Sequence, residues 1–80
     1  MLSKLRRGML GELLWHNMNG ITPNKAAIVN FDGKSLVDNR VRAYRYKVAD
    51  QLIEDGFIQN KGSLGDYALM ITSAGKEALQ

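Results

Sequence analysis

Basic side chains that can bind phosphate groups are concentrated in the middle of the chain. Arg40, Arg42, Arg45 and Lys47 precede the acids of the same segment, which are Asp50, Glu54 and Asp55. If the segment is a helix, its dipole favours the opposite order, and each misplaced exposed charge costs roughly 0.3–1 kcal/mol at low salt. A charge order that lowers helix stability indicates a role outside folding. The simplest interpretation is a helix whose N-terminal half contacts a polyanion.

The composition predicts one small globular domain, residues 1–80. Of the 80 residues, 45% are hydrophobic and 24% are charged, which is typical of a folded chain and not of a disordered one. The net charge is +3, a modest excess whose distribution matters more than its size. The absence of cysteine excludes disulfides and thiolate metal sites. Packing alone, or a second copy of the chain, must therefore hold the fold together.

No group of side chains indicates catalysis, a cofactor or a metal. No serine or histidine is spaced for nucleophilic chemistry, and the eight carboxylates are scattered. His16 is the only histidine, and without companion ligands it is expected to be a packed residue. We therefore expect no enzyme, no cofactor and no small-molecule ligand. Since no apolar stretch approaches the ~18 residues that span a bilayer, we expect a cytoplasmic protein without a membrane partner.

The central basic segment is the clearest predicted helix, over 39–55. Asp38 is a suitable N-cap, and Gly56 supplies the left-handed position that ends many helices. The apolar residues at helical spacing define the face expected to be buried. They are Val37, Val41, Tyr44, Val48 and Leu52.

The flanking segments predict the elements that hold this helix in place. A first helix is expected over 3–18, with Ser3 as its N-cap. After the central helix, FIQN and YALMI predict two antiparallel strands joined by a loop of about six residues. Thr72 is placed to cap a short final helix.

The segment over 21–37 allows two interpretations. A Thr-Pro pair followed by two alanines, within 22–27, is typical of the start of a short helix. The apolar residues that lead into Asp32 and Gly33 instead indicate a hairpin that returns over 34–37. The hairpin is the preferred interpretation, and the short helix stays open.

The order of these elements resembles winged helix-turn-helix DNA-binding domains. The similar residues are Leu52-Ile53-Glu54-Asp55-Gly56-Phe57-Ile58 and Ile71-Thr72-Ser73-Ala74-Gly75. The resemblance is strongest over 39–79 and departs at 21–37 if that segment is a hairpin. It implies an α+β fold, a small winged helix with a recognition helix over 39–55 and a wing over 57–71.

The resemblance implies a protein that binds double-stranded DNA, as a transcriptional regulator or as an architectural or recombination accessory factor. It also allows a homodimer, because paired modules read paired half-sites. In such domains the recognition helix enters the major groove. The DNA-contacting residues expected on this basis are Asn39, Arg40, Arg42, Arg45, Tyr46 and Lys47, with Lys61 from the wing and Lys34 beside the turn. Alanine at Arg42 and Arg45 is then expected to abolish binding without affecting the fold.

The expected contacts differ between side chains. Asn39 and Arg42 are suited to bidentate contacts with bases, and Arg40 and Lys47 are better placed for phosphates. Arg45 lies nearer to the apolar boundary of the helix. The alternative function is a winged-helix protein-interaction module, an adaptor or inhibitor without nucleic-acid binding. An exposed tryptophan would favour it, and Trp15 lies off the apolar stripe of the first helix.

Overall fold

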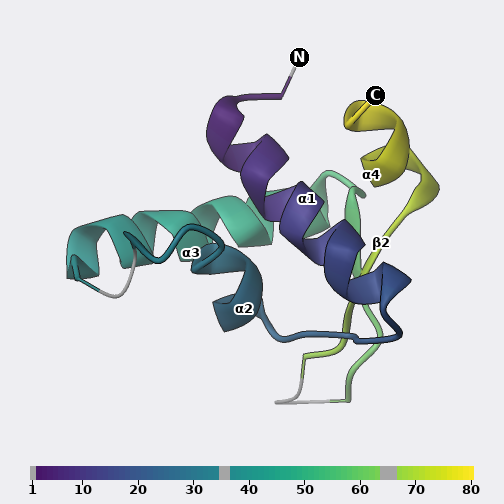
Figure 1. Ribbon diagram of the computed structural model, residues 1–80, viewed down its shortest axis with the longest axis horizontal. Coiled ribbons are helices and arrows are strands. Elements are labelled where there is room, and N and C mark those ends of the chain that lie inside the picture. Colours follow the sequence, from purple (N-terminus) through teal and green to yellow (C-terminus); the bar gives the residue numbers. More distant parts are fainter. Residues whose placement is uncertain (1, 35–36, 64–66) are drawn as a thin grey trace.

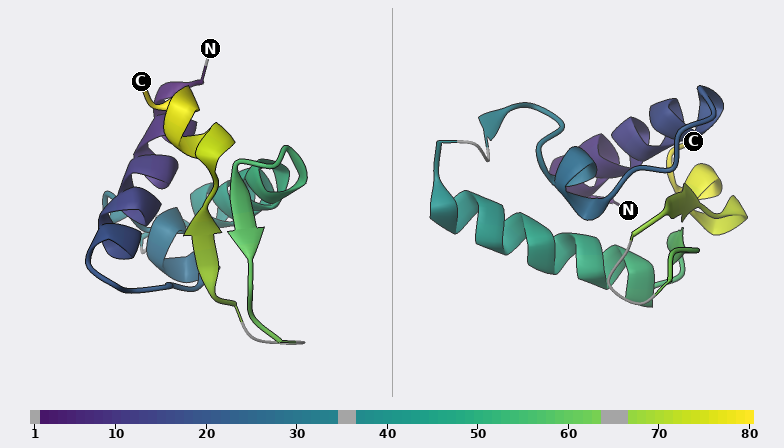
Figure 2. Two further views of the ribbon diagram at one scale, coloured as in Figure 1. Left: turned by 90° about the vertical axis from the view of Figure 1, so that its right-hand side faces the viewer. Right: turned by 90° about the horizontal axis from the view of Figure 1, so that it is seen from below.

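The computed structural model describes residues 2–34, 37–63 and 67–80, which form an α+β fold. The elements in these ranges are α1 (Lys4–Met18), α2 (Lys25–Val29), α3 (Asn39–Glu54), β1 (Ile58–Asn60), β2 (Leu69–Ile71) and α4 (Ser73–Ala78). In Figure 2 (right), α3 lies on one side of the molecule and α1 on the other, with α2 between them. The predicted α+β class is confirmed. None of the described helices is long and apolar enough to cross a membrane.

The two strands form the predicted antiparallel pair, in which Ile58 lies opposite Ile71. Figure 1 shows the hairpin extending to one side of the molecule, while α4 lies at the other end. Asn17 of α1 fixes the hairpin to the helices. Its side-chain amide donates to the carbonyl of Leu69 at 3.1 Å, and its Oδ1 accepts from the N–H of Ile71 at 2.8 Å. The position of the hairpin is therefore set by a side chain more than fifty residues away.

The helix α1 begins and ends where the sequence predicts. Ser3 is its N-cap and accepts a hydrogen bond from the N–H of Arg6 at 3.2 Å. Its buried residues are Met9, Leu10 and Leu13. They join the core cluster formed with α2, α3 and both strands, whose other members are Ile28, Val29, Val48, Ala49, Leu52, Ile58, Leu69 and Ile71.

The preferred hairpin over 21–37 is wrong, because α2 occupies part of this segment. Asn24 caps α2 by accepting a hydrogen bond from the N–H of Ala27 at 3.1 Å. Burial of Ile28 and Val29 in the core outweighs their preference for strands. Described residues 21–34 and 37 contain no strand, and positions 35–36 of the expected return strand lie outside the described residues. The short helix was the correct alternative, but it begins at Lys25 after the N-cap Asn24 and not at the Thr22-Pro23 pair.

The ends of α3 confirm the local signals in the sequence. Asp38 is the N-cap and accepts from the N–H of Arg40 at 2.9 Å. At the other end, Gly56 has φ +83°. The N–H of Gly56 bonds the carbonyl of Ile53 at 3.1 Å, and that of Phe57 bonds the carbonyl of Leu52 at 3.0 Å. This pair of bonds is the Schellman motif, which ends the helix cleanly.

The buried face of α3 differs from the predicted one in its N-terminal half. Leu52 is buried as expected, but Tyr44 is 60% exposed and Val37 is 88% exposed. The inward positions are taken instead by Arg45 and Ala49. The physical reason is that the N-terminal turns of α3 extend beyond the body of the molecule (Figure 1), where no other described element covers them.

Two glycines of α1 offer a matched pair of alanine substitutions. A Cβ at Gly8 would overlap the ring of Phe31, whereas nothing lies within 4 Å of a Cβ at Gly11. Alanine is favoured over glycine inside a helix by about 0.5–1 kcal/mol. We expect Gly11→Ala to raise the free energy of unfolding by that amount. Gly8→Ala is expected to lower it by about 1–2 kcal/mol, because displacing a packed ring costs more than the helix gains. Urea unfolding measures both, and equal stabilities would contradict the packing of Phe31 on Gly8.

Candidate nucleic-acid interface

Three basic residues of α3 are exposed and available to a partner. They are Arg40, Arg42 and Lys47. Within residues 2–34, 37–63 and 67–80, none of the three forms an ion pair. Arg42 is oriented by its neighbour, since its Nη2 donates to Oδ1 of Asn39 at 2.7 Å. We call the exposed residues Asn39, Arg40, Arg42, Ala43 and Lys47 the α3 surface.

The cations of the α3 surface lie on both flanks of the helix. Arg42 and Lys47 are five positions apart, which places them about 140° apart around the helix axis. Arg40 is seven positions before Lys47 and lies on the same flank as Lys47, about 20° away. Asn39 and Ala43 fall in the arc between the two flanks. The α3 surface therefore consists of an uncharged strip, at Asn39 and Ala43, between two positively charged flanks.

Arg45 does not belong to this surface, contrary to the expectation from the sequence. It is 8% exposed, and its guanidinium binds both oxygens of Asp32, at 2.7 and 3.0 Å. Its Nη1 also donates to the carbonyl of Val29 at 3.2 Å, and its guanidinium carbon lies 5.1 Å from the centre of the Phe31 ring. We call this arrangement the Arg45–Asp32 clamp. It ties the middle of α3 to the end of α2 and to the turn that follows.

The clamp changes the acid–base properties of both partners. The Arg45 guanidinium, followed by the N–H of Lys34, holds the pKa of Asp32 well below its usual value of 3.8. In return, the hydrogen bond from Asp32 raises the pKa of Arg45. Asp32 was not among the expected site residues. One signal in the sequence could have indicated the burial of Arg45. Arg45, Ala49 and Leu52 lie at helical spacing, so Arg45 falls on the inward face if the apolar stripe of the helix includes Ala49.

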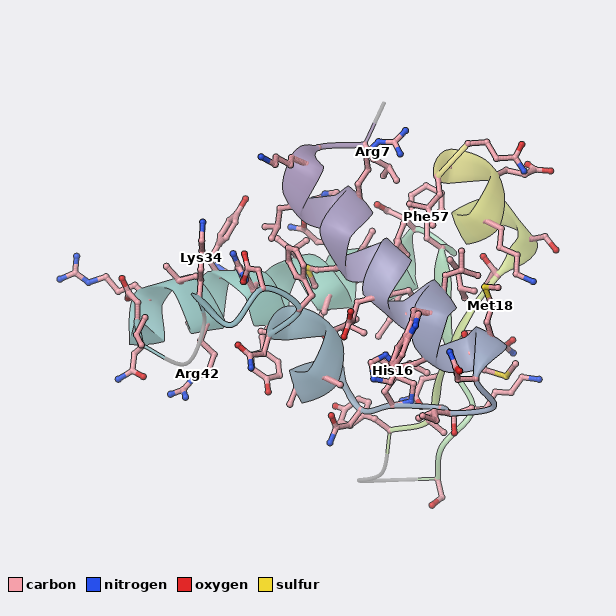
Figure 3. All side chains as sticks on the ribbon, viewed as in Figure 1. Arg7, His16, Met18, Lys34, Arg42 and Phe57 are labelled. Atoms are coloured by element: carbon pink, nitrogen blue, oxygen red, sulfur yellow. The ribbon has the colours of Figure 1, made fainter. Side chains whose placement is uncertain are left out.

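The other expected contact residues are distributed over the molecule. Tyr46 is half-buried and packs against the core, so its ring is partly withdrawn from the surface. In Figure 3, Lys34 and Arg42 point to opposite sides of α3, and Arg42 points to the side on which the hairpin loop extends. The structure therefore does not bring Lys34 to the α3 surface.

Lys61 is exposed at the start of the hairpin loop. Its N–H bonds the carbonyl of Ala68 at 2.9 Å, which extends the pairing of the strands by one step. The side chain of Asn60 accepts from the N–H groups of Gly62 at 2.9 Å and Ala68 at 3.2 Å. These bonds connect the two sides of the hairpin next to Lys61.

Lys25 connects α2 to α3 and to Tyr67, which precedes β2, a role that the sequence did not indicate. Its Nζ binds Oδ1 of Asp50 at 2.8 Å and lies 4.4 Å from the centre of the Tyr67 ring. The hydrogen bond with Asp50 is the main cause of its raised pKa. Asp50 is one of the acids placed unfavourably in the second half of α3, so this part of the reversed charge order has a structural explanation. The partners are 25 positions apart, and no local pattern links them.

Comparisons with protein-family models, with curated proteins and with solved structures found no match for this chain. The functional proposal therefore rests on the surface residues of this chain alone. In the described part of the chain, no three potential ligands from histidine, cysteine, aspartate or glutamate are grouped to hold a metal ion.

Proposed function

We propose that this chain is a small winged-helix protein that binds double-stranded DNA, with α3 in the major groove. The order of α2, a turn, α3 and an antiparallel hairpin is that of a helix-turn-helix followed by a wing. In this assignment α3 is the recognition helix and the β1–β2 hairpin is the wing. The Arg45–Asp32 clamp fixes α2 to α3, as such a unit requires.

The observation that carries the proposal is the position of unpaired cations on both flanks of the α3 surface. A helix in the major groove lies between two phosphate backbones about 12 Å apart, so both flanks can contact phosphate at once. Arg40 and Lys47 would contact one backbone, and Arg42 is placed for the other backbone or for a guanine edge. Asn39 lies on the strip between them and is suited to an adenine edge.

The hairpin supplies a second contact in this proposal. The hairpin extends on the side to which Arg42 points (Figures 1 and 3), so α3 and the hairpin can face the same duplex. Lys61 is the residue proposed to contact phosphate there. One cation on the wing and three on α3 correspond to about four phosphate contacts.

The proposal is tested by fluorescence anisotropy with a labelled duplex of arbitrary sequence at two salt concentrations. About four phosphate contacts give a slope of roughly −3.6 in log affinity against log salt. Between about 50 and 200 mM salt the affinity is then expected to fall by roughly 100-fold. Binding that does not weaken as salt rises, or no binding at the lower concentration, would refute the proposal.

A second candidate function is a protein-interaction module. It is favoured by exposed apolar side chains at the C-terminal end of α1 and just beyond it: Trp15 is 57% exposed, Met18 is 77% exposed and Ile21 is 46% exposed. Exposed apolar groups of this kind are typical of protein contacts. Co-purification from cells separates the two functions, because this alternative predicts a bound protein and no nucleic acid.

A further inference from the structure

A cleft of about 360 Å³ lies between the first turn of α1, residues 31–34 after α2 and the middle of α3. It is lined by Lys4, Leu5, Phe31, Asp32, Lys34 and Arg45. The volume is at the lower end of the range of small-molecule sites, about 300–1,000 Å³. A ligand with a single ring or a short chain fits this size.

The lining of the cleft has an excess of positive charge. Asp32 is its one carboxylate, and the clamp matches it with the charge of Arg45. Lys4 and Lys34 are exposed, and neither forms an ion pair with another described residue. Two uncompensated charges of a net +3 chain therefore meet in one concavity. Low-dielectric walls around such charges concentrate the field and attract anions.

The apolar walls of the cleft are held in place by their neighbours. Leu5 and Phe31 are half-buried and pack against the core. The ring of Phe31 lies against Gly8 and also under the guanidinium of Arg45. The three hydrogen bonds of Arg45 anchor the opposite wall. The apolar walls thus exist before any ligand arrives, which lowers the entropic cost of binding.

The cleft is separate from the α3 surface. In Figure 3 the side chain of Lys34 points away from the side to which Arg42 points. Arg40, Arg42 and Lys47 do not line the cleft. A ligand in the cleft is therefore independent of a duplex on α3, and the two proposals can fail separately.

We propose that this cleft binds a small organic anion consisting of a carboxylate on a compact apolar group. The carboxylate would lie between the ammonium groups of Lys4 and Lys34, which can each donate a charge-assisted hydrogen bond. The apolar group would lie against Leu5 and Phe31. The negative charge of Asp32 excludes anions that reach past the two lysines towards the clamp.

The test is a titration of the full ¹⁵N-labelled chain, followed by NMR, with benzoate as the probe and acetate and inorganic phosphate as comparisons. Benzoate is expected to give saturable shifts at the amides of residues 4–5 and 31–34. Acetate has a carboxylate but no sizeable apolar group, and phosphate has charge but no apolar group at all. Both are therefore expected to bind about tenfold more weakly than benzoate. Phosphate binding as tight as benzoate would overturn the proposed ligand class.

Matched lysine variants complete the test. Lys4→Gln with Lys34→Gln is expected to weaken benzoate binding by about tenfold or more, because each loses a charge-assisted contact. The control, Lys61→Gln with Lys76→Gln, removes the same charge elsewhere and is expected to leave the affinity unchanged. Both pairs are exposed, and the spectra of the free variants report whether the fold is kept. Equal losses in the two double variants, or shifts that do not saturate, would overturn the proposal.

Discussion

Replacing Arg40, Arg42 and Lys47 with alanine is expected to weaken duplex binding by on the order of 100-fold or more at low salt. The same variant should reduce the magnitude of the slope of log affinity against log salt by about 2.7, since three phosphate contacts are lost. All three side chains are exposed and form no ion pair with a described residue, and Arg40 and Arg42 oppose the helix dipole, so the melting temperature should not fall below that of the parent chain. Anisotropy with the labelled duplex measures both quantities.

The control for this result removes the same charge from other parts of the molecule. Alanine at Lys4, Lys34 and Lys76 lowers the net charge equally but leaves the α3 surface intact. Lys76 belongs to α4, which lies at the end of the molecule away from the hairpin loop (Figure 1). We expect a loss of about threefold or less from the change in overall field. Comparable losses in the two triple variants would mean that only net charge matters.

Arg45→Ala is expected to destabilise the fold by on the order of 3 kcal/mol. The change removes a buried side chain and leaves the carbonyl of Val29 without its guanidinium donor. An 80-residue domain has roughly 4–12 kcal/mol of total stability, so the loss is a large fraction. It corresponds to a fall in melting temperature of about 12–24 °C. Arg42→Ala, one turn earlier and exposed, should change stability by about 0.5 kcal/mol or less. Equal melting temperatures for the two single variants would contradict a stabilising role of the Arg45–Asp32 clamp.

The dependence of this difference on pH gives an independent check of the clamp. Because the folded-state pKa of Asp32 is lowered below 3.8, the pair stabilises the fold fully above that pH. The contribution is lost as the pH falls further and the carboxylate is protonated. The gap in free energy of unfolding between the parent chain and Arg45→Ala should therefore narrow below about pH 4. If the difference in free energy of unfolding stays constant down to strongly acidic pH, the ionised Asp32 does not contribute to it.

These expectations revise the variants that the sequence alone would select. Arg42 and Arg45 look equivalent along the chain, and both were expected to contact DNA. In the structure only Arg42 is exposed, so a double alanine variant would lose binding partly through unfolding. Arg42→Ala separates a surface contact from a stability effect.

Local signals in the sequence predicted most of the elements. The caps Ser3, Asp38 and Thr72 and the stop at Gly56 are formed as expected, because each depends on a few consecutive residues. The strands of the hairpin follow in the same way from the two short segments FIQN and YALMI and the polar loop between them. The helices α1, α3 and α4 were accordingly placed within a residue or two.

The errors arose where distant residues decide the structure. The short helix α2 depends on the burial of Ile28 and Val29 against other elements, which a strand-like sequence does not indicate. The inward position of Arg45 depends on Asp32, thirteen positions away. Exposure of Tyr44 depends on how far α3 extends past its neighbours, which no periodicity in the chain encodes. Among the expected contact residues, the structure therefore places Arg45 in the interior and leaves Asn39, Arg40, Arg42 and Lys47 exposed, while their contact with DNA stays a prediction.

The projecting end of α3 also restricts the shape of any partner. It is a convex ridge, exposed at Asn39, Arg40, Arg42, Ala43 and Tyr44. A flat surface could touch only the crest of such a ridge, so it would leave the cations on one or both slopes in water. A partner must be concave and about as wide as a helix to meet both slopes together. The shape of this end of α3 therefore favours a partner with a groove, whatever individual contacts the side chains then make.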